Sequence, residues 1–150
     1  MKIIVVYDSK FGNTGEVAKA IAGAIGAPHT VTIKKVGEAA AAEIGNYDFL
    51  FIGSPTQGGR ATAATISLVD SIAVETLKKL RIAAFDTRLK SALVKIFGYA
   101  AGRIQKSLEG RGLKLVAPGE GFFVEKTKGP VAAGELDRAA AWAKKVTEGK

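Results

Sequence analysis

A turn rich in hydroxyl and amide side chains follows the first apolar run of the chain. The apolar run covers residues 3–7, and a helical pattern opens after the turn, which reads Ser9, Lys10, Phe11, Gly12, Asn13 and Thr14. The first N–H groups of a helix lack intrahelical acceptors, and the helix dipole adds partial positive charge there. The turn therefore predicts a phosphate site with Ser9, Asn13 and Thr14 as donors, although the same side chains would also serve as an ordinary N-cap.

The glycine pattern excludes two common nucleotide-binding loops. The first turn has one glycine and no trailing Gly-Lys pair, so it matches neither the dinucleotide fingerprint nor the triphosphate loop. In a second loop, residues 53–60, two glycines have the triphosphate-loop spacing. Gly59 stands where that loop needs lysine, and Arg60 replaces the magnesium-binding hydroxyl. The second loop is therefore not a triphosphate site.

The composition bounds the class of protein. With 150 residues, the chain is expected to form a single domain over 1–150. It has no cysteine and one histidine, His29, which excludes disulfides, thiolate metal sites and imidazole clusters. The apolar run before Asp8 is too short for a signal-peptide core or a membrane span, so we expect a soluble, cytoplasmic protein.

The net charge of +8 comes from one segment. Residues 78–114 contain ten basic side chains and only two acidic ones, Asp86 and Glu109, whereas the remainder has twelve of each sign. This excess predicts a basic side of the molecule that attracts an acidic partner or a polyanion. A solvated basic face without a ligand is the alternative.

Strand-like apolar runs alternate with helical patterns along the chain. The runs cover 2–7, 29–34, 47–53, 81–86 and 113–116, and 122–124 continues or pairs with the last of them. Several runs are unbroken, which is typical of parallel strands buried on both faces. Helical spacing covers 17–25, 38–44, 61–72, about 100–109 and 136–146, and an extra helical segment is expected at 89–97.

Five strands alternating with five helices predict an α/β fold, a doubly wound five-stranded parallel sheet with helices on both faces. Ligands in such folds bind beyond the carboxyl ends of the strands, where the turns 8–14, 54–60 and 86–99 lie. In the last helix Trp142 falls off the apolar face and is expected to be a surface or packing residue. The side chains expected to face the core there are Leu136, Ala139, Ala140, Ala143 and Val146.

Taken in order, these segments resemble the flavodoxin family. The first turn, with Ser9 and the Asn13-Thr14 pair, is similar to the phosphate loop of that family. The run 49–59 is similar to the family's third strand and second flavin loop, and 81–87 to the strand leading into its third loop. The resemblance extends from residue 1 to about 146, and the length suits the short-chain form.

The resemblance implies noncovalent FMN and electron transfer between redox partners, with no catalytic residue and no metal. It implies that the first turn holds the phosphate and that the loops 54–60 and 86–99 hold the isoalloxazine ring. The cofactor-binding residues that follow are Ser9, Lys10, Phe11, Gly12, Asn13, Thr14, Ser54, Pro55, Thr56, Gln57, Gly58, Gly59, Asp86, Thr87, Arg88 and Tyr99.

Two departures from the family pattern bear on the flavin. The 54–60 loop has no aromatic residue to stack on the ring, so Tyr99 is expected to do so, ahead of Phe97. Flavodoxins are also typically acidic around the cofactor, whereas Arg60, Arg88 and Arg103 are expected near this site. Coulomb's law then predicts a less negative potential for the second electron and redox partners with an acidic docking surface.

Two other functions are compatible with the sequence. An FMN-dependent NAD(P)H:quinone or flavin reductase would need room for a second ring over the flavin. A flavin-free interaction module of the same fold would bind an acidic protein through the basic side, and the missing aromatic keeps this reading open. No membrane partner is expected, and nucleic acid is disfavoured because no basic platform interleaved with aromatic residues is present.

Overall fold

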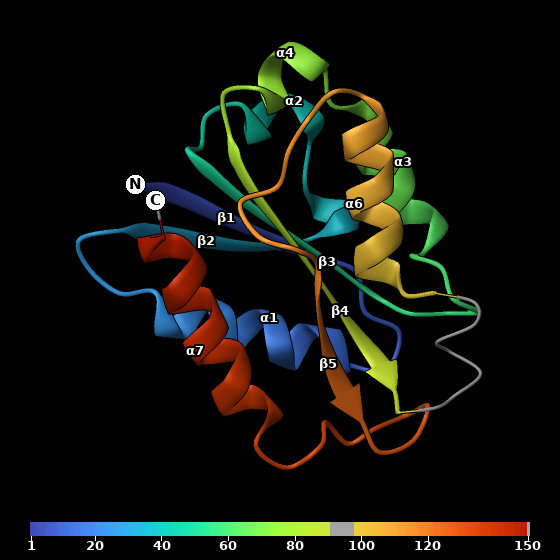
Figure 1. Ribbon diagram of the computed structural model, residues 1–150. Helices are drawn as coiled ribbons and strands as arrows, with labels where there is room; N and C mark the ends of the chain where they lie inside the picture. The colour runs from blue at the N-terminus through green and yellow to red at the C-terminus, as the bar shows by residue number, and fades with distance from the viewer. Residues whose placement is uncertain (91–97, 150) are drawn as a thin grey trace.

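Five parallel strands form the central sheet of the protein, which a computed structural model describes over residues 1–90 and 98–149 (Figure 1). The strand order is β2-β1-β3-β4-β5, which is the predicted doubly wound topology. The strands are β1 Lys2–Tyr7, β2 Thr30–Lys35, β3 Phe49–Pro55, β4 Arg81–Leu89 and β5 Glu120–Val124.

Helices cover both faces of the sheet. α1 Asn13–Ala24 and α7 Glu135–Glu148 lie on one face, and α3 Ala63–Ser71 and α6 Ala100–Gly110 lie on the other (Figure 1). Among the described residues, none of the helices combines the length and the apolar character needed to cross a membrane. The shorter helical segments are the 3-10 helix η1 Val36–Glu38, α2 Ala41–Ile44 and α4 Val74–Leu77.

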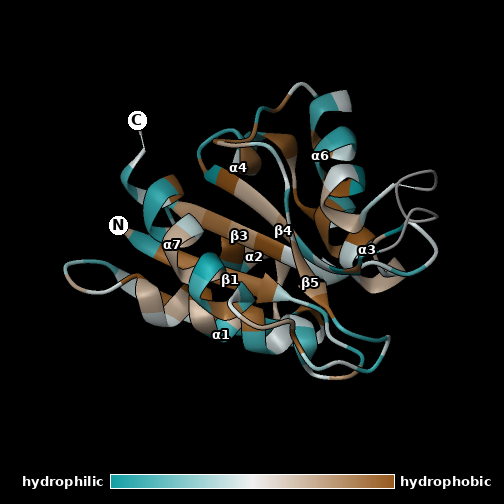
Figure 2. Ribbon diagram, turned by 60° about the horizontal axis from the view of Figure 1, so that its bottom comes forward, coloured by the Kyte–Doolittle hydropathy of each residue, from teal (hydrophilic) through white to brown (hydrophobic). Residues whose placement is uncertain are grey.

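The central strands are apolar because both of their faces are covered. In β1, Ile3 and Val5 pack into the cluster under α1 and α7, whereas Ile4 and Val6 pack into the cluster under α3 and α6. All four side chains are fully buried. Figure 2 shows the hydrophobic strands between helices that turn hydrophilic residues outward. Polar side chains that could do chemistry are therefore confined mainly to the strand ends.

The last strand differs from the prediction. The run 113–116 is not a strand, and β5 is formed by Glu120–Val124 instead. Leu113 and Leu115 are buried as expected, but they pack into the core beside α6 as part of a connection. The backbone of this run bonds to β4 through the N–H of Val116, which donates to the carbonyl of Ile82 with an N–O distance of 2.9 Å. Burial alone therefore did not make this apolar run a strand.

β4 extends beyond its predicted end and carries polar residues into the sheet. The last residues of β4 form a strand where a loop was predicted. On one side Asp86 and Thr87 pair with Ser54 and Pro55 of β3. On the other side the end of β4 pairs with β5. Leu89 also belongs to this strand rather than to a helix. The rest of the helical segment predicted at 89–97 lies outside the described residues.

The predicted helix 38–44 is divided into two short segments, η1 and α2. The backbone is extended at Ala39 and Ala40, which separates them. The carboxylates of Glu38 and Glu43 accept the N–H groups of Lys35 and Ala40, so each segment has its own start. Local side-chain acceptors thus interrupt a pattern that would otherwise favour one helix.

In α7, Trp142 packs against the core, whereas Leu136 does not. The Trp142 ring makes edge contacts with three core rings, at centroid distances of 5.7 Å to Phe51, 6.4 Å to Phe85 and 5.8 Å to Phe122. Leu136, predicted to face the core, is 38% exposed. The indole is wide enough to reach the sheet from the flank of the helix.

Trp142→Ala should therefore destabilise the fold by about 3 kcal/mol, because it removes a large ring from the aromatic cluster and leaves a cavity. Leu136→Ala, on the same helix, should change the free energy of unfolding by no more than about 0.5 kcal/mol. Urea unfolding of both variants measures this difference. Similar losses for the two variants would contradict the assignment of Trp142 to the core.

Candidate functional site

Four segments meet in a hollow at the carboxyl edge of the sheet. Its volume is about 440 Å³ with the open mouth included. The segments are the first turn, the loop after β3, the end of β4 and the hairpin after β5. The lining residues are Ser9, Lys10, Phe11, Asn13, Thr14, Pro55, Thr56, Gln57, Thr87, Arg88, Leu89, Val124 and Thr127.

The first turn presents uncapped helix donors to this hollow. The N-cap of α1 is Gly12, at φ 93°, and it has no side chain to cap the helix. Ser9 Oγ accepts the N–H of Gly12 at 3.1 Å and that of Gly15 at 3.4 Å. No acceptor among residues 1–90 and 98–149 takes the N–H of Asn13 or Thr14. An anion in the hollow beside the start of α1 would meet these two donors.

A hydroxyl pair joins the first turn to β4. Thr14 Oγ1 and Thr87 Oγ1 are 2.8 Å apart, and the two residues are only 1% and 5% exposed. Each hydroxyl can donate one hydrogen bond and accept others, so one of the pair keeps a donor for a further acceptor. Both residues line the hollow. The pair therefore fits a phosphate oxygen as a third partner.

The loop after β3 is anchored behind the hollow. Ser54 is fully buried, donates to the carbonyl of Pro55 at 2.9 Å and accepts the N–H of Thr62 at 3.0 Å. Thr62 Oγ1 donates to the Asp8 carboxylate at 2.5 Å, and the N–H of Ser9 donates to the same carboxylate at 2.9 Å. Ser54 thus ties the loop to the first turn, and its hydroxyl is not directed into the hollow.

Gly58 and Gly59 form the tip of a tight turn. Gln57 and Arg60 exchange two backbone hydrogen bonds, and the glycines have φ values of 57° and 77°. Positive φ at both central positions defines a turn that strongly favours glycine. Arg103 of α6 donates through Nε to the Gly59 carbonyl at 3.3 Å. The two glycines therefore have a conformational reason to be present in addition to any approach of a ligand.

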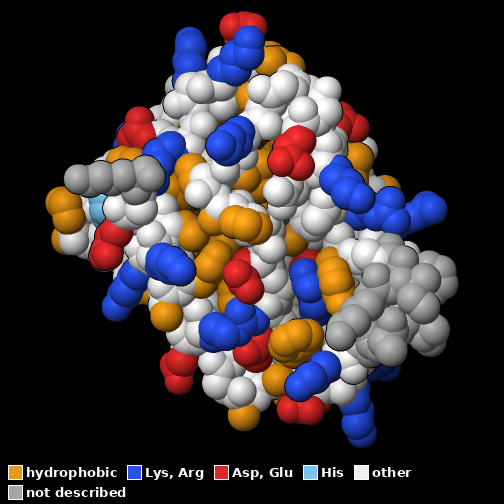
Figure 3. All heavy atoms as spheres, in the orientation of Figure 1, with side chains coloured by type: hydrophobic (Ala, Val, Ile, Leu, Met, Phe, Trp, Pro, Cys, Tyr) orange, Lys and Arg blue, Asp and Glu red, His pale blue; other side chains and the backbone are white. Residues whose placement is uncertain are grey.

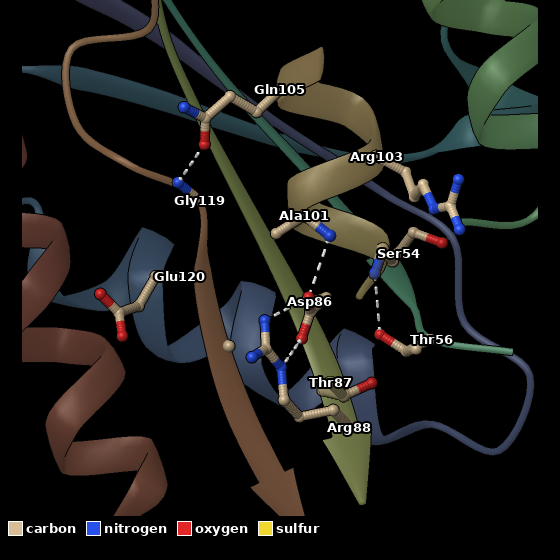
Figure 4. Close-up of polar contacts among 12 residues, drawn as sticks. Ser54, Thr56, Asp86, Thr87, Arg88, Ala101, Arg103, Gln105, Gly119 and Glu120 are labelled. Atoms are coloured by element: carbon tan, nitrogen blue, oxygen red, sulfur yellow. Dashed lines mark hydrogen bonds and ion pairs between the residues drawn. The ribbon is translucent and has the colours of Figure 1, made fainter. Parts of the chain in front are cut away.

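A buried ion pair lies at the end of β4 (Figure 4). Arg88 donates from Nε and Nη2 to the two carboxylate oxygens of Asp86, at 2.8 and 2.7 Å, and Ala101 donates its N–H at 2.9 Å. Asp86 has no exposed surface. Burial raises the pKa of its carboxyl, and the hydrogen bonds and charge of Arg88 oppose that rise.

The same pair positions Tyr99 and the start of α6. The Arg88 guanidinium carbon lies 3.4 Å from the centroid of the Tyr99 ring, a cation–π contact. Gly121 leaves the room that the guanidinium needs, since an added Cβ would lie 2.0 Å from Arg88 Nε. Thr56 Oγ1 accepts the N–H of Ala100 at 3.1 Å. The loop after β3 and the end of β4 together satisfy the first donors of α6.

The structure divides the predicted site residues into two groups. Ser9, Lys10, Phe11, Asn13, Thr14, Pro55, Thr56, Gln57, Thr87 and Arg88 line the hollow. The remaining predicted residues do not line it: Gly12, Ser54, Gly58, Gly59, Asp86 and Tyr99. Two of these bond to lining residues, since Ser54 donates to the carbonyl of Pro55 and Asp86 accepts from Arg88. Tyr99 contacts Arg88, and Phe97 lies outside the described residues.

Sequence reasoning missed the part of the hollow that follows β5. Val124 and Thr127 line it there. Leu89, at the end of β4, also lines the hollow; it lay within the predicted loop 86–99 but not among the predicted site residues. After β5 the chain turns back, with the N–H of Glu125 bonded to the carbonyl of Pro130 at 2.9 Å, and Gly129 packs against Asn13. Correct placement of the last strand would have found Val124, because its carboxyl end lies at the same edge. The hairpin itself has no such signal in the sequence.

The basic stretch 78–114 does not form one side of the molecule. Arg81, at the opposite end of β4, donates to carbonyls at the end of α7, including that of Val146 at 3.3 Å. Arg111 donates to the carbonyls of Val69 and Ile72. Figure 3 shows Lys and Arg side chains spread over the whole visible face. The described part of the predicted basic side is therefore divided, because β4 carries Arg81 and Arg88 to opposite ends of the sheet. Lys95 lies outside the described residues.

The fold is that of the doubly wound α/β proteins, and the hollow lies at the carboxyl edge of the sheet, where proteins of this class bind their ligands. The family model for flavodoxin matches residues 5–142. The chain belongs to the flavodoxin family, whose members bind FMN and transfer electrons to redox partners. A search of curated proteins finds no match.

Solved flavodoxin structures share the fold. An archaeal flavodoxin superposes with a TM-score of 0.79 at 22% identity, over 99% of this chain and 100% of that chain. Flavodoxin 2 from Bacillus cereus has a TM-score of 0.75 at 24% identity, over 99% of both chains. Two-electron reduced Megasphaera elsdenii flavodoxin has a TM-score of 0.71 at 19% identity, over 95% of this chain and 98% of that chain.

Arg88→Met should destabilise the protein by roughly 3–5 kcal/mol near pH 8, because it leaves the Asp86 carboxylate buried without its counter-ion. Removing Arg88 raises the folded-state pKa of Asp86 further above the unfolded value. Stability then falls as the pH rises between these two values, so the loss should shrink near pH 5. Urea unfolding at both pH values, without added flavin, measures the change.

The Asp86→Asn/Arg88→Met double variant is the matched control, since it contains neither charge. It should lose less stability than Arg88→Met near pH 8 and depend less on pH. If Arg88→Met lowered the free energy of unfolding equally at both pH values, the Asp86 carboxylate would not depend on Arg88 for its stabilisation.

Proposed function

We propose that the chain binds FMN in the hollow and carries electrons between redox proteins. The observation that carries the proposal is the pair of uncapped N–H groups at Asn13 and Thr14, two residues that line the hollow at the start of α1. A phosphate suits these donors because it is an anion with several acceptor oxygens. Membership of the flavodoxin family supports FMN as the phosphate-bearing ligand.

In this proposal the phosphate lies against the first turn, where Ser9, Asn13 and Thr14 can contribute side chains. The open mouth is bordered by Pro55, Thr56 and Gln57 on one side and by Thr87, Arg88 and Leu89 on another. These residues would orient the isoalloxazine ring and limit the access of water. The flavin supplies the electron chemistry when bound, and the protein sets its orientation and potential.

Aromatic stacking would differ from the family pattern. Phe11 is the one aromatic residue among the described residues that line the hollow, and it lies in the first turn. Tyr99 has one face of its ring against Arg88, so a flavin could contact only the other face. We propose that Tyr99 contributes to the ring site through that second face, held by the Asp86–Arg88 pair.

The direct test is titration of the purified protein with FMN. Binding should turn the protein yellow and quench FMN fluorescence. A colourless protein that leaves the emission of FMN unchanged would remove both the carrier and the reductase from consideration and leave the flavin-free module. Steady-state oxidation of NAD(P)H with a quinone would instead favour the reductase.

Thr14→Val should weaken FMN binding by roughly tenfold to a hundredfold and leave riboflavin binding nearly unchanged. The valine keeps the shape of the side chain but removes a hydroxyl that can donate to a charged phosphate, an interaction of about 1.5–3 kcal/mol. Fluorescence titration with both ligands measures the difference. Equal losses for FMN and riboflavin would remove Thr14 from the phosphate site.

Thr87→Val provides the matched comparison, since it removes the partner hydroxyl from the adjacent strand. If the two threonines act as one unit, the double variant should lose little more affinity than Thr14→Val alone. Fully additive losses would show that the hydroxyls act independently.

A further inference from the structure

Basic residues lie in or next to each of the segments that form the hollow. We define the basic rim as Lys10, Arg60, Lys90, Lys126 and Lys128. All five are exposed. Lys10 lines the hollow. Lys90 follows Leu89 in the sequence, and Lys126 and Lys128 flank Thr127; Leu89 and Thr127 are lining residues. Arg60 closes the turn that begins at Gln57. The rim therefore draws on all four segments of the site.

The basic rim has more positive charges than the carboxylates near it can offset. No rim residue forms an ion pair with a carboxylate in the described part of the chain. At the same edge Asp86 is paired with Arg88. Glu135 interacts with Lys90 of the rim, and it is itself paired with Arg138. Asp8 accepts hydrogen bonds from neutral groups, which do not cancel a negative charge. Glu125 is the exposed carboxylate of the hairpin. The rim thus carries an excess of positive charge.

Aromatic rings lie beneath three of the rim ammonium groups. Lys10 and Lys128 lie 5.6 and 6.0 Å from the centroid of Phe11, which is 42% exposed. Lys90 lies 5.9 Å from the centroid of Phe123. A ring near an ammonium group attracts it and keeps it at the surface. Each ring also offers apolar contact beside the charges, as docking surfaces commonly do.

We propose that the basic rim is the docking surface for a redox protein whose electron-exchange face is acidic, and that it steers such a partner to the hollow. This inference rests on the proposed FMN function, because the hollow must hold the redox group. Electrostatic complementarity raises the rate of encounter by roughly ten- to a thousandfold, and salt screens it. The argument depends on local charge at this edge, not on the net charge of the chain.

The first test uses small electron acceptors of opposite charge. The FMN-loaded, reduced protein is mixed with ferricyanide, an anion, or with hexaammineruthenium(III), a cation. Each acceptor takes one electron from the flavin, so Fe(III) becomes Fe(II) and Ru(III) becomes Ru(II). The ferricyanide rate should fall about tenfold between about 10 and about 200 mM ionic strength, and the ruthenium rate should rise.

Two triple variants of equal net charge distinguish local from overall charge. Lys90→Gln/Lys126→Gln/Lys128→Gln changes rim residues that do not line the hollow. Lys79→Gln/Lys114→Gln/Lys145→Gln changes exposed lysines that precede β4, approach its first half, or lie in the last turn of α7. The rim variant should lose most of the salt dependence with ferricyanide, and the far variant should keep it. Flavin potentials are measured for each variant so that rates are compared at known driving force.

A binding measurement without flavin chemistry completes the test. Fluorescein-labelled decaglutamate serves as an acidic probe, and fluorescence anisotropy reports its binding to the FMN-free protein at low salt. The rim variant should bind it about tenfold more weakly than the far variant. Equal weakening in the two variants, or salt effects of the same sign with both metal complexes, would overturn the docking surface. Failure of the protein to bind FMN would instead overturn the proposed function. The peptide measurement does not depend on flavin, so it would still test the acidic-partner surface.

Discussion

The sheet is buried on both faces, and this constraint determines where chemistry can occur in the molecule. Strands β1, β3 and β4 must present apolar side chains to two helical layers, so Ile3 to Val6 and Phe49 to Ile52 have almost no exposed surface. Polar side chains are tolerated where the strands end. All strands are parallel, so their carboxyl ends meet at one edge, and the four segments of the hollow leave the sheet there.

Asp86 is the exception to this rule, and the way in which it is accommodated shapes the site. A fully buried carboxylate inside a strand is costly unless its oxygens are paired. Arg88 supplies two hydrogen bonds and Ala101 a third, and Gly121 leaves the space for the guanidinium. The pair also contacts Tyr99, so the stabilisation of one buried charge fixes the start of α6 beside the hollow. A neutral pair of this kind adds little net charge to the ligand site.

Particular residues show why much of the fold was predictable and part of the site was not. The unbroken apolar runs of β1 and β3 and the polar first turn are local patterns, so their placement followed from the sequence. The contacts of Asp86 with Arg88, of Thr14 with Thr87 and of Asn13 with the hairpin after β5 join distant or unpatterned segments. Leu113 and Leu115 were predicted to lie in a strand because they are apolar. They are buried, but they belong to a connection between α6 and β5.

The distribution of charge is another property that the order of residues in the sequence does not reveal. A run of lysines and arginines in sequence is divided by β4 and α6 between the two ends of the sheet, and Arg81 and Arg111 are used to bind carbonyls. The basic rim is assembled instead from residues scattered over the chain, from Lys10 to Lys128. Screening limits each exposed charge to a range of about 8–10 Å in ordinary salt. Recognition at the hollow therefore depends on the few charges that the strand ends bring together, and the net charge of +8 is a poor guide to it.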